Sequence, residues 1–410
     1  MPDEETNLVD EFFKHDRVII EAALELTSGS FFQPTGFPDI GACIFVDKDG
    51  RRRCLVESEQ SMANRLEAVC TQAPGTWSVP FVGKLPIIEV ADGSGNLLGT
   101  NLTEPHRISS SYILEGTLNG GNDKLQEIVR KKLGISDDGK RWPLDKRGEL
   151  SGVVFALDPA AILHGFQFMQ WSAVGLRQQR LLHARMEAVL AGDSDVHYGA
   201  VKVDAIDPDG HREKSNVGQS IAYKARLIPE SITATFEIDV LGLRARRLVS
   251  NGGESATGDA NVAAQKFLLA LALWKIRQFL ADQSAFDPRT GQTDRALRLR
   301  SDCALKLRYM KTKEDQSKTW TLRYRTQSNG AQFDEPVALT LANLVKVSDD
   351  SAQPLAAVPD FKPFLKDVIG KDGLEIRVTY TAPPAKPKGA TPKESTETES
   401  DVENEDDPGE

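Results

Sequence analysis

The chain has 410 residues, 40% of them hydrophobic, and a formal net charge of −10 at neutral pH. This length and composition support a substantial buried core, either as one large domain with insertions or as two domains. No run of eighteen apolar residues occurs and the first residues are acidic, so membrane insertion and secretion are not supported and a cytoplasmic location is expected. The four cysteines show no Cys-x-x-Cys spacing, which disfavours a zinc site and fits reduced thiols.

The first elements in chain order are a helix and a hairpin. Apolar residues between 7 and 26 predict a helix over this range, and residues 41–47 and 52–57 predict two strands. Asp49-Gly50 lies between these strands and is typical of a tight hairpin turn. A second helix is expected to leave the second strand directly, so the chain opens as an α+β layer.

Polar side chains gather at the start of that second helix: Ser58, Gln60, Ser61, Asn64 and Arg65. Free backbone N–H groups and the positive end of the helix dipole favour an anion at such a position. At 100° per residue, Gln60 and Asn64 lie opposite an apolar stripe, and Ser61 and Arg65 lie along one flank. The pattern predicts a phosphate-binding surface, with the alternative that Ser58 only caps the helix and the other residues form an ordinary solvated face.

This segment resembles the signature of the backbone RAMP subunit of the type I-G (formerly type I-U) CRISPR Cascade complex. The resemblance continues in matching order over most of residues 40–305, through Glu104-Pro105-His106-Arg107-Ile108, Asp158-Pro159-Ala160-Ala161-Ile162-Leu163-His164-Gly165, Asn216-Val217-Gly218 and Leu297-Arg298-Leu299-Arg300-Ser301-Asp302-Cys303. His164 departs from the family pattern, which has an aromatic residue there. The resemblance implies an α+β fold with a ferredoxin-like or RRM-type antiparallel sheet and large insertions that form palm, fingers and thumb.

The resemblance also implies a function. Several copies of the chain would bind one guide crRNA head to tail, as a helical filament, and the guide would pair with a strand of target DNA. Other Cascade subunits and the effector helicase-nuclease would be further partners in this antiviral defence. Ser58, Gln60, Ser61, Asn64 and Arg65 would hold the guide backbone, with no catalytic residue, no metal and no cofactor.

Later segments predict further strands and one long helix. The strands are expected at residues 85–90, 151–157, 199–206, 232–240, 304–310, 319–325 and 374–380, and the helix at 262–281. Polar stretches at 119–148, 207–220 and 250–260 are predicted to be loops. Residues 1–382 are expected to form one domain with inserted finger and thumb elements. Residues 383–410, with nine acids and three lysines, are expected to form a disordered acidic tail.

Positive charge is concentrated between residues 295 and 325, where ten Arg and Lys accompany three acids. Alternation along the two strands of this region places Lys306, Arg308, Arg323 and Arg325 on one face. Such a face can hold a polyanion, and Arg298 and Arg300 precede it in the same basic segment. The alternative is a solubilising exterior.

Two weaker sets are further candidates for RNA contact. His106 and Arg107 lie beside three serines and Tyr112, although Arg107 could instead pair with Glu104 or Glu115. Arg177 and Arg180, with Arg185, are predicted on a helix, where simple exposure explains them equally well.

Two other functions remain open from the sequence. One is a metal-dependent ribonuclease on the same scaffold, with Asp204 or Asp207 as its metal ligand, although Asp-Pro-Asp-Gly is also typical of a turn. The other is a protein-only assembly scaffold whose basic strands bind acidic partners. No Walker loop, dinucleotide loop, nucleophile elbow or paired histidine motif is found.

Overall fold

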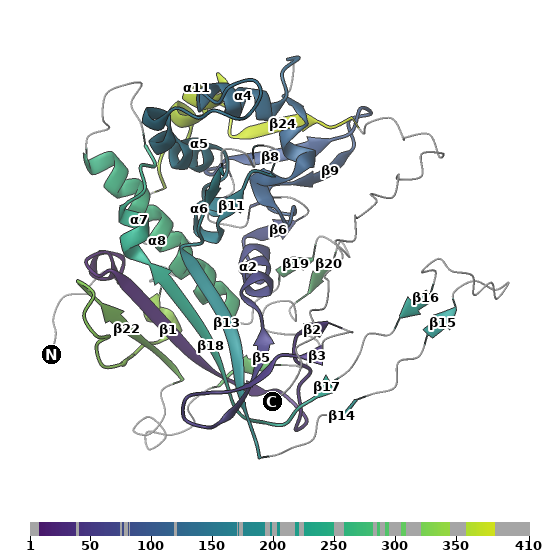
Figure 1. The fold of residues 1–410 in the computed structure, drawn as a ribbon, viewed down its shortest axis with the longest axis vertical. Coiled ribbons are helices and arrows are strands. Elements are labelled where there is room, and N and C mark those ends of the chain that lie inside the picture. The colour runs from purple at the N-terminus through teal and green to yellow at the C-terminus, as the bar shows by residue number, and fades with distance from the viewer. Residues whose placement is uncertain are drawn as a thin grey trace, which may run out of the picture. The chain divides into compact units, whose positions relative to one another are not determined.

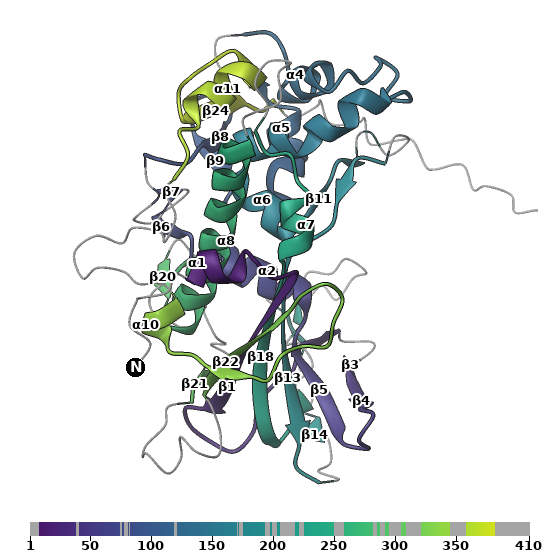
Figure 2. The ribbon, with the colours of Figure 1, turned by 90° about the vertical axis from the view of Figure 1, so that its left-hand side faces the viewer.

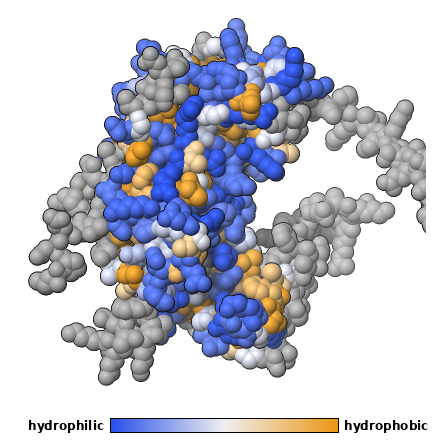
Figure 3. Space-filling model, turned by 60° about the vertical axis from the view of Figure 1, so that its left-hand side comes forward, coloured by the Kyte–Doolittle hydropathy of each residue, from blue (hydrophilic) through white to orange (hydrophobic). Residues whose placement is uncertain are grey.

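The computed structural model of the chain describes residues 8–37, 41–73, 76–77, 81, 83–118, 121–169, 171, 175–192, 197–198, 203–205, 218–220, 225–249, 258–281, 285–287, 292–294, 305–308, 321–344 and 358–381. Two sheets and the helices around them belong to one unit that ends at Tyr380 (Figure 1). Among these described residues, none of the helices is both long and apolar enough to span a membrane. The face drawn in Figure 3 is largely hydrophilic, with small and scattered hydrophobic patches.

The larger sheet has eight strands, and every neighbouring pair in it is antiparallel. Its order is β23 (Val337–Ala338), β22 (Leu322–Gln327), β1 (Arg17–Leu26), β18 (Pro229–Asp239), β13 (Leu182–Leu190), β5 (Arg52–Glu57) and β4 (Ile44–Val46). The short strand β21 (Leu305–Leu307) also pairs with β1.

Four of these strands and two helices follow a repeated connection. In chain order they are β1, α2 (Glu59–Ala68), β13, β18, α8 (Gly258–Leu280) and β22. In the sheet, the four strands have the order β22, β1, β18 and β13. The hairpin β4–β5 is inserted before α2 and extends the sheet beyond β13. The arrangement is therefore two strand–helix–strand units that share one antiparallel sheet.

One face of the large sheet is apolar and is covered by helices. The alternating residues Val18, Ile20, Ala22 and Leu24 of β1 are buried, as are their counterparts on β13 and β18. Helix α8 reaches this face through Phe279, whose ring lies 6.0 Å from that of Phe236 on β18. Helix α2 contacts both β13 and α8. The start of α2 is thus held at the edge of a packed core (Figure 2).

The second sheet lies in the part of the molecule drawn above the large sheet in Figure 1. It has the order β10 (Thr117–Leu118), β24 (Glu375–Thr379), β8 (Ile87–Ala91) and β9 (Leu97–Thr100), and β24 runs parallel to β8. Around it are α3 (Ser111–Leu114), α4 (Leu125–Lys132), α5 (Leu150–Leu157), α6 (Pro159–His164), α11 (Lys362–Ile369) and the 3₁₀-helices η1 (Arg107–Ser109) and η2 (Leu144–Glu149).

The remaining elements are short. They are the helices α1 (Leu8–Phe12), α7 (Val240–Arg244) and α10 (Leu341–Leu344), and the strand pairs β2–β3 (Gly36–Phe37, Gly41–Ala42), β6–β7 (Thr71–Ala73, Thr76–Trp77), β11–β12 (Phe166–Gln167, Arg177–Gln178), β14–β17 (His197–Tyr198, Ala225–Arg226), β15–β16 (Val203–Ala205, Gly218–Ser220) and β19–β20 (Ala285–Asp287, Gln292–Asp294).

Several predicted elements are confirmed. The mixed α and β composition with antiparallel sheets is observed, and the Asp49-Gly50 turn joins β4 to β5 with Gly50 at φ 77°. The helix α2, the long helix α8 and the strands β8, β18, β21, β22 and β24 also lie where the sequence predicts them. Residues 382–410 lie outside the described residues, so the acidic tail and the extent of the single domain stay predictions.

The predicted helix over residues 7–26 is wrong. A short helix, α1, ends at Phe12, and β1 begins at Arg17. The segment from Arg17 is rich in Glu, Ala and Leu, which favour helices, but its buried residues alternate with period two. Pairing with β18 and β22 on both sides therefore outweighs local helix propensity.

Three further predictions of secondary structure are also wrong. Residues 151–157, predicted as a strand, lie in α5, where seven of the eight residues are buried, and a uniformly apolar run does not distinguish a strand from a buried helix. The predicted helix around Arg177 to Arg185 is replaced by β12 and β13. The predicted loop over residues 119–148 contains α4 and η2.

Candidate nucleic-acid interface

Helix α2 begins at the end of β5 because Ser58 caps it. Ser58 has extended backbone angles, and its Oγ accepts a hydrogen bond from Ser61 N at 3.3 Å. Met62 and Leu66 are fully buried, which fixes the rotation of the helix. Gln60 and Asn64 are consequently exposed on the opposite side, as the sequence predicts.

A side chain from a distant part of the chain completes the polar surface at this helix start. Arg180, between β12 and β13, donates from Nη1 to Glu59 Oε2 at 3.2 Å and from Nη2 to Gln60 Oε1 at 3.1 Å. Gln60 Nε2 in turn donates to Asn64 Oδ1 at 3.3 Å. Arg180, Gln60 and Asn64 therefore form one hydrogen-bonded row, which we call the α2 row.

The backbone around Gly165 sets the position of Arg180. Arg180 Nε donates to the carbonyl oxygen of His164 at 3.3 Å. Gly165 has φ 75°, and a Cβ there would lie 2.9 Å from Gln178 O and 3.0 Å from Arg180 N. Only glycine permits this close approach, so α6 and the strand β12 hold Arg180 against α2.

The negative charge at the start of α2 is compensated locally. Glu59 lies in the first turn and accepts from Arg180, and its Oε2 is also 3.4 Å from His183 Nδ1. Burial lowers the pKa of Arg180, an effect that the charge of Glu59 partly offsets. A phosphate bound at this position would therefore take the place of the Glu59 carboxylate as the partner of Arg180 and His183.

Arg65 lies beside this surface but is bound on its inner side. Its Nη2 donates to Glu57 Oε1 at 2.7 Å, and about a fifth of the Arg65 side chain is exposed, against 3% of Glu57. The contact joins α2 to the end of β5. Arg65 therefore contributes charge to the α2 surface while it also stabilises the turn from strand to helix.

Arg107 does not lie on the surface. Its Nη2 donates to Glu67 Oε2 at 2.6 Å and its Nε donates to the other oxygen of the same carboxylate, and both side chains are buried. Burial opposes the charge of Arg107, but attraction and hydrogen bonds from Glu67 prevail and raise the pKa of Arg107. The predicted RNA contact of Arg107 is not retained, and its partner is Glu67 rather than Glu104 or Glu115.

Asp158 lies next to this buried pair. Its carboxylate accepts from Ala161 N at 3.3 Å, as the N-cap of α6, and from Ile108 N at 3.2 Å. Burial and the charge of Glu67 raise the pKa of Asp158 to about 6, against the opposing effect of Arg107. Asp158 therefore links the start of α6 to η1, next to the Arg107–Glu67 pair.

We expect Asp158 to make stability depend on pH. Its folded pKa of about 6 exceeds the 3.8 of an aspartate in the unfolded chain, so the folded state binds the proton more tightly and gains stability as pH falls from about 7 towards 4. In urea unfolding, Asp158→Asn should lack this gain, which is on the order of 3 kcal/mol. If the free energy of unfolding changed equally with pH in the wild type and in Asp158→Asn between pH 4 and 7, this expectation would be contradicted.

The basic strand face, Lys306, Arg308, Arg323 and Arg325, is largely neutralised by acids of β1. Lys306 pairs with Glu25 at 3.4 Å, and Arg323 pairs with Glu21 at 2.9 Å. Arg325 lies 3.9 Å from the same Glu21. Of this face only Arg308 is exposed without a described ion pair, so the face is a network of cross-strand pairs.

The other candidate residues are placed individually. His106 is exposed, and Arg177 is exposed on β12 rather than on a helix. Arg298 and Arg300 lie outside the described residues. Arg185 donates to Glu187 on its own strand at 3.1 Å.

Comparison with known proteins gives one family. Residues 18–192 match the family of CRISPR-associated protein GSU0053. The match contains β5, α2, β13 and all of β1 except its first residue, and with them the whole α2 row. It confirms the recognition of a CRISPR-associated family from the sequence motifs, while type I-G stays a prediction because the match names no subtype.

Two solved structures are similar at low identity. One is a chain of a CRISPR RNA-guided surveillance complex before nicking, with 13% identity, a TM-score of 0.25, and coverage of 63% of this chain and 69% of that one. The other is Csc2 of Thermofilum pendens, with 9% identity, a TM-score of 0.21, and coverage of 66% and 63%. Both TM-scores are below 0.5, so neither establishes a shared fold. No curated protein matches the sequence.

The described residues contain no group of three or more His, Cys, Asp or Glu side chains placed to hold a metal ion. Asp204 lies in β15, and its side chain is outside the described part, as are Asp207 and Asp209. The hydroxyl, amide and guanidinium groups of the α2 surface can all donate hydrogen bonds. The chemistry that they offer is the binding of an anion.

Proposed function

We propose that this chain is a non-enzymatic subunit that binds guide crRNA in a CRISPR surveillance complex of the Cascade type. The observation that carries the proposal is the α2 row, where Arg180, Gln60 and Asn64 lie at a helix start within the matched segment. These groups can contact a sugar-phosphate backbone without reading bases. Base pairing by the guide would then recognise the target DNA strand.

The order of the large sheet supports the finer proposal of a ferredoxin-like or RRM-type palm. Strands β22, β1, β18 and β13 alternate with α2 and α8 as that fold requires. Copies in a head-to-tail filament, a type I-G complex with its effector helicase-nuclease, and a cytoplasmic location complete the proposal.

Co-expression of the full chain with a guide RNA tests the proposal. The protein should purify with RNA that resists nuclease, recorded as a ratio of absorbance at 260 and 280 nm typical of nucleic acid. The variant Gln60→Ala/Asn64→Ala/Arg180→Gln should retain at least about tenfold less guide, because it loses the donors and leaves Glu59 without its guanidinium partner.

A matched variant of the same surface should have the opposite effect. Glu59→Gln removes a negative charge beside the phosphate site and leaves Arg180 in place, so guide retention should be equal or higher. Lys48→Gln, on the distant β4–β5 turn, is the neutral control. Absence of bound RNA, or equal losses in Glu59→Gln and Arg180→Gln, would refute the proposed contact.

A further inference from the structure

A second charged surface lies away from α2, in an open groove of about 1670 Å³. Its walls are α4, η2, the start of α8, α11, and the chain that follows α7. Among the described lining residues, seven are Arg or Lys and five are Asp or Glu. We call it the α4–α8 groove. It is much larger than a single phosphate or nucleotide requires.

Most charges in the groove already have partners. Lys132 pairs with Asp367 at 2.7 Å, Lys146 with Glu149 at 2.9 Å, and Arg130 with Asp137 at 2.9 Å. Arg244 is bound by Asp16, which lies outside the groove, at 2.6 Å. Three of the five acids of the groove are therefore paired within it, while Asp123 and Glu127 form no ion pair with a described residue. Three cations also stay without such a pair, and they give the groove its capacity to bind an anion.

Three cations of the groove form no ion pair with a described residue: Lys131, Arg246 and Arg247. Lys131 and Arg247 are exposed. Arg246 is half-buried, and its Nε is buried without a hydrogen-bond partner among the described residues. An anion in the groove would supply the acceptors that these donors lack.

The segment that carries the two arginines is held rigidly. Asn261 Oδ1 accepts from Leu248 N at 2.7 Å, and Asn261 Nδ2 donates to Arg246 O at 3.1 Å. Gln265 Nε2 donates to the carbonyl oxygens of Arg244 and Arg246 at 2.9 and 2.8 Å. Because this backbone is fixed before any ligand arrives, binding would cost little ordering entropy.

Helix α5 reinforces the same segment from the other side. A Cβ at Gly152 would lie 3.3 Å from Leu248 O and 3.6 Å from Arg247 O, so glycine allows α5 to pack close to it. Asn261, Gln265 and Gly152, all buried or half-buried, thus position Arg246 and Arg247, as a binding surface requires and a simple solvated loop does not.

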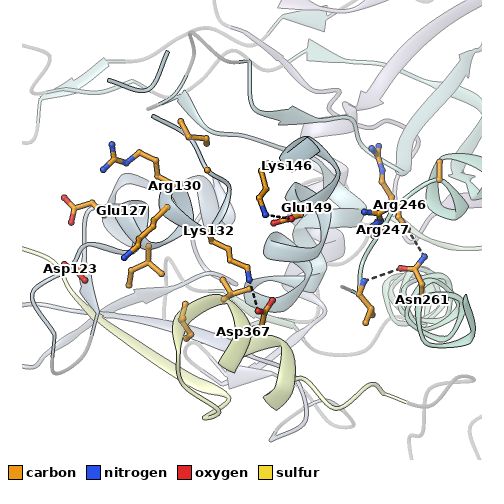
Figure 4. A pocket seen from close by; sticks show the side chains of 18 of the residues that line it. Asp123, Glu127, Arg130, Lys132, Lys146, Glu149, Arg246, Arg247, Asn261 and Asp367 are labelled. Carbon is orange, nitrogen blue, oxygen red and sulfur yellow. Dashed lines mark hydrogen bonds and ion pairs between the residues drawn. The ribbon is translucent and has the colours of Figure 1, made fainter. Parts of the chain in front are cut away.

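The cations are spread along the groove. In Figure 4, Arg130 and Lys132 of α4 lie towards one end, and Arg246 and Arg247 lie at the other. Lys131 belongs to the α4 wall, so the three cations without a described ion pair lie on different walls of the groove. A compact anion would favour donors that converge on one point, whereas an extended polyanion favours donors along a line.

We propose that the α4–α8 groove binds a sugar-phosphate backbone, as a second nucleic-acid surface separate from the guide-binding surface at α2. Arg246 and Arg247 each contact phosphate oxygens through their guanidinium groups, and Lys131 contacts the backbone from the α4 wall. Because none of these contacts reads a base edge, the groove binds without sequence preference. Duplex DNA, single-stranded DNA and single-stranded RNA share this chemistry.

Fluorescence anisotropy with short labelled duplex DNA, single-stranded DNA and single-stranded RNA tests the groove, with the full chain and salt from about 50 to 200 mM. The variant Lys131→Gln/Arg246→Gln/Arg247→Gln should bind at least about tenfold more weakly, and its salt slope should fall by about one per lost contact. The relative affinities of the three probes identify which nucleic acid the groove prefers.

The matched control is Lys48→Gln/Lys84→Gln/Lys362→Gln, which removes three exposed cations outside the groove and should leave the affinity and slope nearly unchanged. The α2 variant Gln60→Ala/Asn64→Ala/Arg180→Gln should retain less guide, while the affinity of its groove for the labelled probes stays unchanged. The groove variant should bind the probes more weakly and retain as much guide as the wild type. Each of the two proposals can therefore fail without the other. Unchanged binding by a groove variant with wild-type unfolding would overturn the inference, as would equally tight binding of a poly-glutamate peptide.

Discussion

Arg107→Gln should lower the free energy of unfolding by about 3–5 kcal/mol, the cost of removing one partner from a buried ion pair. Arg107 is paired with Glu67, and Asp158 lies beside them, so the substitution leaves two buried carboxylates without that guanidinium. Gln and Arg are equally affected by the φ of 54° at this position. The loss of stability in Arg107→Gln would therefore come from the lost ion pair and not from backbone strain.

Urea denaturation at neutral pH measures the effect, with Arg177→Gln as the control because it removes the same charge from an exposed position on β12. That control should change stability by less than about 1 kcal/mol. Arg107→Gln should also regain stability at acidic pH, where the buried carboxylates of Glu67 and Asp158 take up protons. Equal stabilities for the two variants would mean that the ion pair is not important for folding.

Gly165→Ala should destabilise the protein by about 2–4 kcal/mol and also weaken retention of guide RNA. Its φ of 75° is unfavourable for alanine, and the added Cβ would meet backbone atoms of Gln178 and Arg180 at 2.9–3.3 Å. Since those atoms belong to the chain that carries Arg180, relief of the clash should move Arg180 away from Gln60 and Glu59.

Gly175→Ala separates the effect of the positive φ from the effect of the Cβ contact with neighbouring backbone atoms. Gly175 also has a positive φ, 62°, but a Cβ there would meet no atom within 4 Å. It should therefore cost only about 1 kcal/mol and leave guide retention unchanged. Thermal unfolding together with the 260/280 nm ratio checks both variants, and similar losses in both would show that close approach at Gly165 does not position Arg180.

The start of α2 could be predicted from the sequence because its determinants are local. Ser58 is a strong capping residue, and the spacing of Met62, Leu66, Val69 and Cys70 defines the buried side of the helix. The exposure of Gln60 and Asn64 follows directly from that spacing. The hairpin at Asp49-Gly50 was predictable for the same reason, since its turn needs a positive φ that glycine supplies.

The rest of the site depends on contacts between distant residues. Arg180 reaches Glu59 across 121 positions, and Arg107 reaches Glu67 across 40, so no local pattern links them. The strand β13 that positions Arg180 contains residues that favour helices, and its alternation of buried and half-buried positions depends on pairing with β5 and β18. The ion pairs of the basic strand face could not be predicted, because Glu21 and Glu25 lie on a strand that the sequence predicted as a helix.

Helix α8 links the two surfaces as a rigid spacer. Asn261 near its first turn fixes the arginines of the groove, and Lys275 near its other end donates to His164 Nε2 at 2.8 Å, next to the carbonyl group that holds Arg180. Fourteen residues of helix separate these positions by about 21 Å along the axis. If each surface carries a strand, the interval between the two strands is set by the length of one helix, and every copy of the subunit would impose the same interval.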